Sequence, residues 1–197
     1  MKFSHKIVAA SSALLLVTVS LLTAKQYFTM QSELKEQVEA SVTEIVDGVR
    51  NTVASVINGK KDVAAYATSM LELDLAPDKI RDVISRPVVR DAFILAGVGF
   101  EKDGSHIGND PTWKPGDSWD PRVRPWYIDA KNANKLIITA PYADSATKEI
   151  LVSIATPVKD NGRFIGAIFY DVSLGSLAEL VNQVKLFDAG YVFIVAG

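Results

Sequence analysis

The chain has 197 residues, of which 48% are hydrophobic and 22% are charged, and its net charge is -2. This composition is typical of a folded protein rather than a disordered one, and the charge gives no general attraction for nucleic acid. The chain has no cysteine, which excludes disulfides, thiol catalysis and Cys-based metal sites. Its two histidines, His5 and His106, lie far apart and offer little material for a metal site or a Ser-His-Asp triad. We therefore expect no cofactor, no metal and no nucleic-acid partner.

Residues 7–24 (IVAASSALLLVTVSLLTA) form an apolar run without a charged residue. As a helix the run would span ~27 Å, close to the ~30 Å hydrocarbon core of a bilayer. A cleavable signal peptide is the alternative, and its removal would leave a secreted soluble domain. The run is long for a signal peptide, and Leu22 is not the small residue expected three positions before a cleavage site. The pattern favours an uncleaved transmembrane helix, with the basic residues 1–6 in the cytoplasm and the remainder outside.

Residues 26–75 are predicted to form a long stalk helix. No proline interrupts them before residue 77, and apolar residues recur at an average of ~3.6 positions, the period of a helix. The stripe consists of Tyr27, Met30, Leu34, Val38, Val42, Ile45, Val49, Val53 and Val56. Such a stripe needs a partner, which is either the sheet of the same domain or a second copy of the helix. We expect a homodimer through this helix.

Residues 76–186 are predicted to form a PAS-like α+β module with a five-stranded antiparallel sheet and helices to one side. The expected strands are residues 92–100, 105–108, 135–140, 150–158 and 164–172. The last two are joined by a segment containing Asn161-Gly162, the strongest short hairpin signal. The expected helices are residues 77–85, which Pro87 closes, 125–132 and 174–186. Residues 109–120 and 141–149 are expected to be loops.

Residues 119–127 (WDPRVRPWY) combine two arginines with aromatic residues and two prolines. Arginine offers a planar fork of donors that matches a carboxylate, and Trp and Tyr offer apolar walls with one polar atom each. Pro121 and Pro125 restrict the backbone around the arginines. Taken alone, the motif fits a clamp for a small anion and a packed surface loop equally well.

Four features together resemble the double-Cache sensor domain of bacterial methyl-accepting chemotaxis proteins, in the subset that binds amino acids. They are the long helix after a membrane span, WDPRVRPWY at 119–127, PYAD at 141–144 and FYDVSL at 169–174. The resemblance covers nearly the whole chain. It implies that residues 76–186 are the membrane-distal ligand-binding module. Residues 187–197 resemble the start of the membrane-proximal module, so we expect the chain to be a fragment of a longer protein.

The resemblance also implies which residues hold an amino-acid ligand. Trp119, Arg124 and Trp126 would hold its carboxylate, and Tyr127 completes the motif. Asp171 and Asp144, with Tyr142 beside them, would hold its ammonium group. The family usually has tyrosine in place of Trp119, and an indole donates a hydrogen bond but cannot accept one, so the ligand range is expected to differ.

Some of these residues have structural alternatives. Asp171 lies in an apolar strand and would be costly to bury without a partner, so it pairs either with a ligand or with a loop arginine. Asp144 is either a ligand residue or an ordinary turn residue. Arg122 is assigned either to that pairing with Asp171 or to bracing the loop, rather than to the ligand.

The function that the resemblance implies is that of a non-enzymatic chemotaxis receptor in the bacterial inner membrane. It would sense small molecules in the periplasm, with L-amino acids as the expected ligands, and signal across the membrane to the chemotaxis kinase and its coupling protein. The same input domain occurs on histidine kinases and diguanylate cyclases, which remain the alternative. A secreted hydrolase lacks a plausible nucleophile and base in this sequence.

Overall fold

The structure, a computed structural model, describes residues 3–116 and 118–182. The chain divides into two units, residues 1–48 and residues 49–197. Helix α1 (Phe3–Leu71) supplies residues to both units. The last part of the predicted helix 174–186 and the whole of residues 187–197 lie outside the described residues.

In the first unit the apolar side chains of α1 are exposed, as illustrated by Leu14 at 67%. The hydroxyl groups of Ser11 and Thr18 donate to the carbonyl oxygens of Ile7 and Leu14, each at 3.0 Å. Polar side chains inside a bilayer need such internal partners because no water is present there. In the part of the chain that the structure describes, α1 is the one helix long and apolar enough to cross a membrane, although a signal sequence has the same properties.

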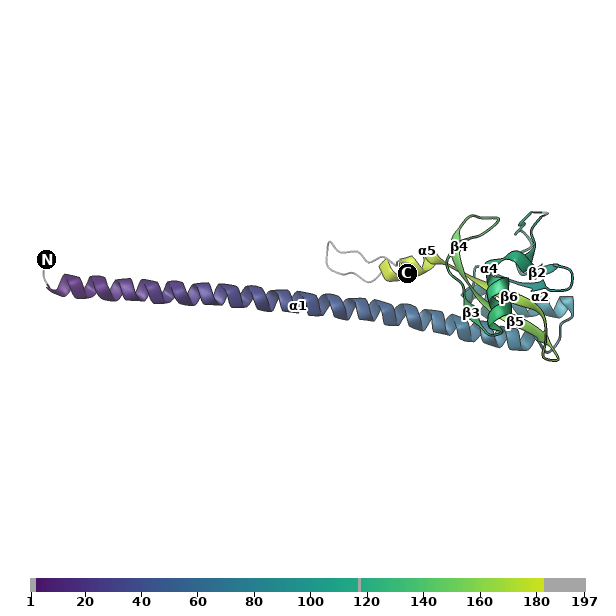
Figure 1. Cartoon of the computed structure of the whole chain (residues 1–197), viewed down its shortest axis with the longest axis horizontal. Helices are drawn as coiled ribbons and strands as arrows, with labels where there is room; N and C mark the ends of the chain where they lie inside the picture. The colour runs from purple at the N-terminus through teal and green to yellow at the C-terminus, as the bar shows by residue number, and fades with distance from the viewer. Residues whose placement is uncertain (1–2, 117, 183–197) are drawn as a thin grey trace. The chain divides into compact units, whose positions relative to one another are not determined.

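The second unit contains a six-stranded antiparallel sheet (Figure 1). Its strands are β1 (Leu95–Phe100), β2 (His106–Gly108), β3 (Ile137–Ile138), β4 (Tyr142–Ala143), β5 (Ile150–Asp160) and β6 (Arg163–Ser173). Besides the end of α1, its helices are α2 (Pro77–Ile84), α3 (Pro87–Ala92), the 3-10 helix η1 (Pro121–Val123), α4 (Pro125–Ala133) and α5 (Leu174–Asn182). The strand order is β2-β1-β6-β5-β3, and β4 also pairs with β5. The predicted fold class, a long N-terminal helix followed by an α+β antiparallel sheet module, is confirmed.

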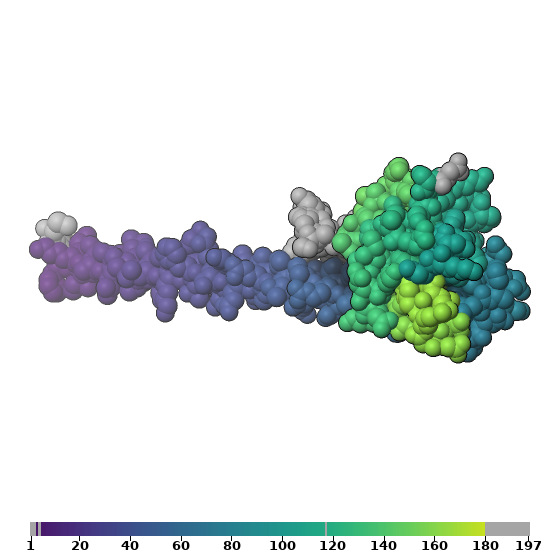
Figure 2. Space-filling model, turned by 45° about the vertical axis from the view of Figure 1, so that its right-hand side comes forward, coloured from purple at the N-terminus to yellow at the C-terminus, as the bar shows by residue number. Residues whose placement is uncertain are grey.

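The predicted hairpin of β5 and β6 forms the centre of the sheet. Asn161 and Gly162 at its turn have φ angles of 49° and 80°, and positive φ at both central residues gives a turn that matches the twist of paired strands. The residues of this turn are exposed, and this end of the hairpin is coloured yellow-green on the surface of the second unit in Figure 2. From there the strands pair along their length, and Ser153 lies directly opposite Asp171.

Alternation along β6 divides the core into two clusters. Ile168, Tyr170 and Val172 pack in the cluster that contains the buried residues of α1, α2 and α5. Ala167 and Phe169 pack in a second cluster with Trp126 and Ala130 of α4. The prediction of helices on one side was therefore wrong, because α4 covers the face opposite α1. The sequence 125–132 shows where a helix forms but not which face of the sheet it covers.

Three local predictions also differ from the structure. Residues 142–143, expected in a loop, form the sixth strand β4, which is too short to show any alternation. Pro87 opens the second helix α3 instead of only ending the first, because proline suits the first turn of a helix. As a consequence the first strand begins at Leu95 rather than at residue 92.

A close contact fixes the loop before α4 against the sheet. A Cβ atom on Gly99 of β1 would lie 2.4 Å from the Cβ of Pro121 and 3.2 Å from the ring of Trp126. Only glycine leaves room for this approach. Gly99 therefore allows residues 119–127 to lie directly on the sheet, with Arg124 held just before the first turn of α4.

Candidate functional site

A cavity of about 160 Å³ opens on the α4 side of the sheet, beside the ends of β1, β5 and β6. Its apolar wall consists of Ile94, Leu95, Leu151 and the ring of Trp113. Its polar wall consists of Asp110, Asp144, Thr147, Glu149 and Asp171. The cavity thus combines an apolar lining with convergent polar groups, as small-molecule sites do.

Asp171 is the most deeply buried carboxylate of the cavity, with 3% of the residue exposed. Ser153, its cross-strand neighbour, donates a short hydrogen bond to its Oδ1 atom, and the Tyr142 hydroxyl donates to the same atom at 3.5 Å. Burial raises the pKa of Asp171 to about 7, against the lowering effects of Ser153, Tyr142 and the charge of Arg124. No ion pair of Asp171 is present among the described residues. The carboxylate is therefore held by neutral donors in a place where a cation would stabilise it.

Tyr142 connects this carboxylate to strand β4. Its hydroxyl lies 2.6 Å from the Ser153 Oγ atom. Burial raises the pKa of Tyr142, and the negative charge of Asp171 raises it further. Tyr142 therefore stays protonated, and its one O–H proton is directed at Ser153 and Asp171.

Asp144 lines the cavity and also shapes its own turn. Its Oδ1 atom accepts hydrogen bonds from the backbone N–H groups of Ala146 and Thr147, at 3.0 and 2.7 Å, and from the Thr147 hydroxyl at 3.0 Å. Burial raises the pKa of Asp144, but these donors outweigh burial and the net shift is downward. Asp144 is thus an ionised group at the cavity and a turn residue at once, and the two alternatives from the sequence are compatible.

The two arginines of residues 119–127 have different environments. Arg122 forms an ion pair with Asp120, at 2.7 Å between Nη2 and Oδ2, so of its two predicted structural roles it has the bracing of the loop and not the pairing with Asp171. Arg124 is half-buried, and its guanidinium has no hydrogen bond or ion pair among the described residues. Its positive charge nevertheless lowers the pKa values of both Asp171 and Tyr142. Arg124 therefore acts electrostatically on Asp171 and has donors to offer, although it is not among the residues that line the cavity.

The predicted aromatic residues lie at different depths. Trp126 and Tyr127 are 2% and 1% exposed and do not line the cavity. Trp126 packs on Phe169 with 4.6 Å between ring centroids, and the Tyr127 hydroxyl donates to Glu101 Oε2 at 2.8 Å. These two residues anchor α4 beneath Arg124.

Trp113 is a lining residue that the sequence did not point to, whereas the predicted Trp119 does not line the cavity and packs against Trp113. The rings of Trp119 and Trp113 meet edge to face, 5.2 Å apart. The Trp113 Nε1 atom is buried without a hydrogen bond of standard geometry, although its N–H contributes to lowering the pKa of Asp144. A tryptophan in a loop rich in Pro and Gly was the available signal for this position. For Ser153, the signal was a hydroxyl residue among the apolar residues of β5.

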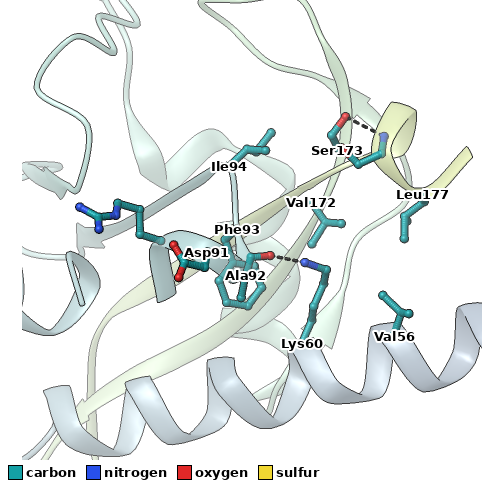
Figure 3. Close-up of a pocket in the computed structure, with 11 residues that line it drawn as sticks. Val56, Lys60, Asp91, Ala92, Phe93, Ile94, Val172, Ser173 and Leu177 are labelled. Carbon is teal, nitrogen blue, oxygen red and sulfur yellow. Dashed lines mark hydrogen bonds between the residues drawn. The ribbon is translucent and has the colours of Figure 1, made fainter. Parts of the chain in front are cut away.

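A larger cavity of about 540 Å³ lies on the opposite side of the sheet, next to α1 (Figure 3). Its half-buried cation, Lys60, already donates to the Ala92 carbonyl oxygen and lies 5.4 Å from the centre of the Phe93 ring. Its carboxylate, Asp91, is exposed. This cavity therefore has no buried charge that needs a ligand, and the smaller cavity is the better candidate.

The comparison with known protein families decides the assignment. The Cache domain model matches residues 24–197 of the chain. The chain belongs to the Cache domain family. The relatives of this Cache domain protein include the methyl-accepting chemotaxis protein PctB of Pseudomonas aeruginosa, 27% identical over 197 residues, or 100% of this chain and 31% of PctB. They also include McpA of Pseudomonas putida, 29% identical over 98% of this chain and 30% of McpA. The chain thus spans about a third of the length of these relatives.

Solved ligand-binding domains of chemoreceptors share the fold of this Cache domain. The domain of Mlp24 with asparagine is 45% identical, with a TM-score of 0.71 over 81% of this chain and 67% of that chain. The domain of PctC of Pseudomonas aeruginosa with GABA is 27% identical, with a TM-score of 0.67 over 71% of this chain and 66% of that chain. The resemblance to amino-acid-binding chemoreceptor sensors is confirmed.

Proposed function

We propose that this Cache domain binds L-α-amino acids as the periplasmic input of a chemotaxis receptor. The observation that carries the proposal is the buried Asp171, a carboxylate with neutral donors and no ion pair among the described residues. An amino-acid ammonium group supplies the missing cation. Mlp24 was solved with asparagine and PctB with L-Gln, which supports the same ligand class here.

In this proposal the two ends of the amino acid are recognised separately. The ammonium group binds Asp171, with Tyr142 and Asp144 beside it. The carboxylate binds the Arg124 guanidinium, since Arg124 has donors without a partner among the described residues and acts electrostatically on Asp171. Trp119 supports the carboxylate end, and the buried Trp126 and Tyr127 hold Arg124 in position. The part common to all amino acids is then bound by fixed groups, which lowers the entropic cost of binding.

The organisation of the whole receptor follows from the same proposal. Residues 7–24 cross the inner membrane, residues 26–75 form the stalk, and residues 76–186 form the ligand-binding module in the periplasm. The stalk forms a homodimer, and in the full-length protein the signal reaches the chemotaxis kinase and coupling protein. A ligand shifts such a receptor only by its difference in affinity for two arrangements. The relatives named above are methyl-accepting chemotaxis proteins, which favours this output over a histidine kinase or a diguanylate cyclase.

Calorimetry on the chain in lipid nanodiscs tests the binding proposal. A panel of L-amino acids should contain ligands that release or absorb heat and raise the melting temperature, because a ligand of the native state stabilises it. Arg124→Ala and Asp171→Ala should each weaken binding by roughly 100-fold or more, since each leaves a ligand charge unpaired. Asp91→Ala, in the cavity beside α1, is the matched control and should bind normally. Binding of simple amines or carboxylates, with no response to any amino acid, would refute the proposal.

A further inference from the structure

The groups assigned to the ammonium and carboxylate ends leave part of the cavity unused. Asp110, from the loop after β2, and Glu149, from the start of β5, also line it. Neither belongs to the motifs that predicted the site. Trp113 and Thr147 line the cavity with them.

Both carboxylates are held in place by the protein. Asp110 Oδ1 accepts hydrogen bonds from the backbone N–H and the hydroxyl of Thr112, both at 2.7 Å. Glu149 Oε1 accepts from the Ser173 hydroxyl at the end of β6. These bonds occupy one oxygen of each carboxylate. The hydrogen bonds from Thr112 lower the pKa of Asp110, so this group is ionised at neutral pH.

The charges around the cavity are unbalanced. Asp110, Asp144, Glu149 and Asp171 all line it, and its described lining contains no Lys, Arg or His. The acidic groups are not arranged as a metal site, because no three His, Asp or Glu residues in residues 3–116 and 118–182 are grouped to hold an ion. A bound amino acid brings one ammonium group for these four carboxylates, while its own carboxylate is matched by Arg124. An uncompensated negative potential therefore remains at the side-chain end.

We propose that Asp110 and Glu149 select the ligand's side chain, by rejecting acidic side chains and favouring those that end in a hydrogen-bond donor. This selectivity rests on the proposed function, since it assumes that the cavity binds an amino acid. An amide or a cationic side chain can donate to the free oxygens of Asp110 and Glu149. A carboxylate side chain meets two like charges, and because both side chains are exposed each is worth at most roughly fivefold in affinity.

The sharpest test compares two isosteric ligand pairs, L-asparagine with L-aspartate and L-glutamine with L-glutamate. Affinities are measured by calorimetry at pH 7.5 on the full chain in nanodiscs. We expect each amide to bind about tenfold more tightly than its acid, and added salt to narrow the difference because screening weakens repulsion between exposed charges. Asp110→Asn and Glu149→Gln remove one charge each and keep the shape. Each should reduce the ratio by roughly two- to fivefold, chiefly by improving the binding of the acid.

Asp129→Asn is the matched control, because Asp129 is an exposed acid on α4 that does not line the cavity. It should leave the ratio unchanged. If asparagine binds and aspartate binds equally well, the selectivity proposal is wrong while the proposed function stands. If the ratio is large but insensitive to both variants, the assignment to Asp110 and Glu149 is wrong. If no amino acid of the panel binds, the proposed function fails and this selectivity fails with it.

Discussion

Replacing Asp171 by asparagine should stabilise the ligand-free domain while abolishing ligand binding. Burial raises the pKa of Asp171 from 3.8 to about 7 in the folded state. A carboxyl group with a raised pKa favours folding when it is protonated, so its stabilising effect is present below pH 4 and is lost as pH rises through 7. Above pH 7 Asp171 of the wild-type domain is ionised, and the buried site stabilises this negative charge less than water does in the unfolded chain.

The size of the effect follows from the shift. A shift of about three pKa units, at 1.36 kcal/mol each, means that ionising Asp171 costs at most about 4 kcal/mol more in the folded domain than in the unfolded chain. Asparagine keeps an oxygen that can accept from Ser153, but its amide N–H groups need partners that the pocket supplies only in part. We therefore expect Asp171→Asn to raise the free energy of unfolding by about 2 kcal/mol at pH 8 and by almost nothing at pH 5.

Thermal unfolding of the chain in nanodiscs, followed by circular dichroism from pH 5 to 8, measures this difference. A gain of about 2 kcal/mol raises the melting temperature by roughly 4–8 °C for a domain of this size. Asp91→Asn, an exposed acid beside the larger cavity, is the control and should show no such pH dependence. Should Asp171→Asn be destabilising at pH 8, Asp171 would be well paired in the ligand-free domain, and the central argument for the site would fail.

Three further predictions concern the site and its support. The affinity for an amino-acid ligand should rise by up to about tenfold per pH unit between pH 5.5 and 7 and then level off. The reason is that the ligand binds the ionised form of Asp171, so binding below pH 7 releases a proton. Calorimetry in buffers of different ionisation heat detects that proton. Trp126→Ala should cost about 3–5 kcal/mol in urea unfolding, since the ring is buried against Phe169. Tyr127→Phe removes the donor to Glu101 and should cost about 1 kcal/mol of stability while leaving affinity nearly unchanged; a large loss of affinity would show that the hydroxyl contacts the ligand.

The sequence predicts those parts of the fold that have a local cause. The stalk has a helical period, and Asn161-Gly162 specifies the central hairpin, so α1, β5 and β6 appear as expected. The different roles of Arg122 and Arg124 are also readable, because Asp120 lies two residues before Arg122 and accepts from its backbone and side chain.

Features that depend on tertiary packing are not readable in the same way. Strand β4 has two residues and exists only because β5 pairs with it. Trp113 lies in a loop without any period, and its place in the cavity is set by contacts with Trp119 and Phe169 from distant parts of the chain. The face that α4 covers is likewise decided by Gly99, whose missing side chain makes room for Pro121 and Trp126.

The position of Asp171 connects the stability of the sheet to the proposed binding reaction. Asp171 pairs with Leu95 of β1 and with Ser153 of β5, so its charge lies on the central one of three paired strands, near the strand ends that border the cavity. A hydrophobic residue there would favour folding, and the domain instead keeps a carboxylate with a raised pKa. An ammonium group that neutralises this carboxylate adds its binding free energy to the stability of those strands. β6 continues directly into α5, so a change in stability at Asp171 acts on the strand from which the chain leaves the sheet.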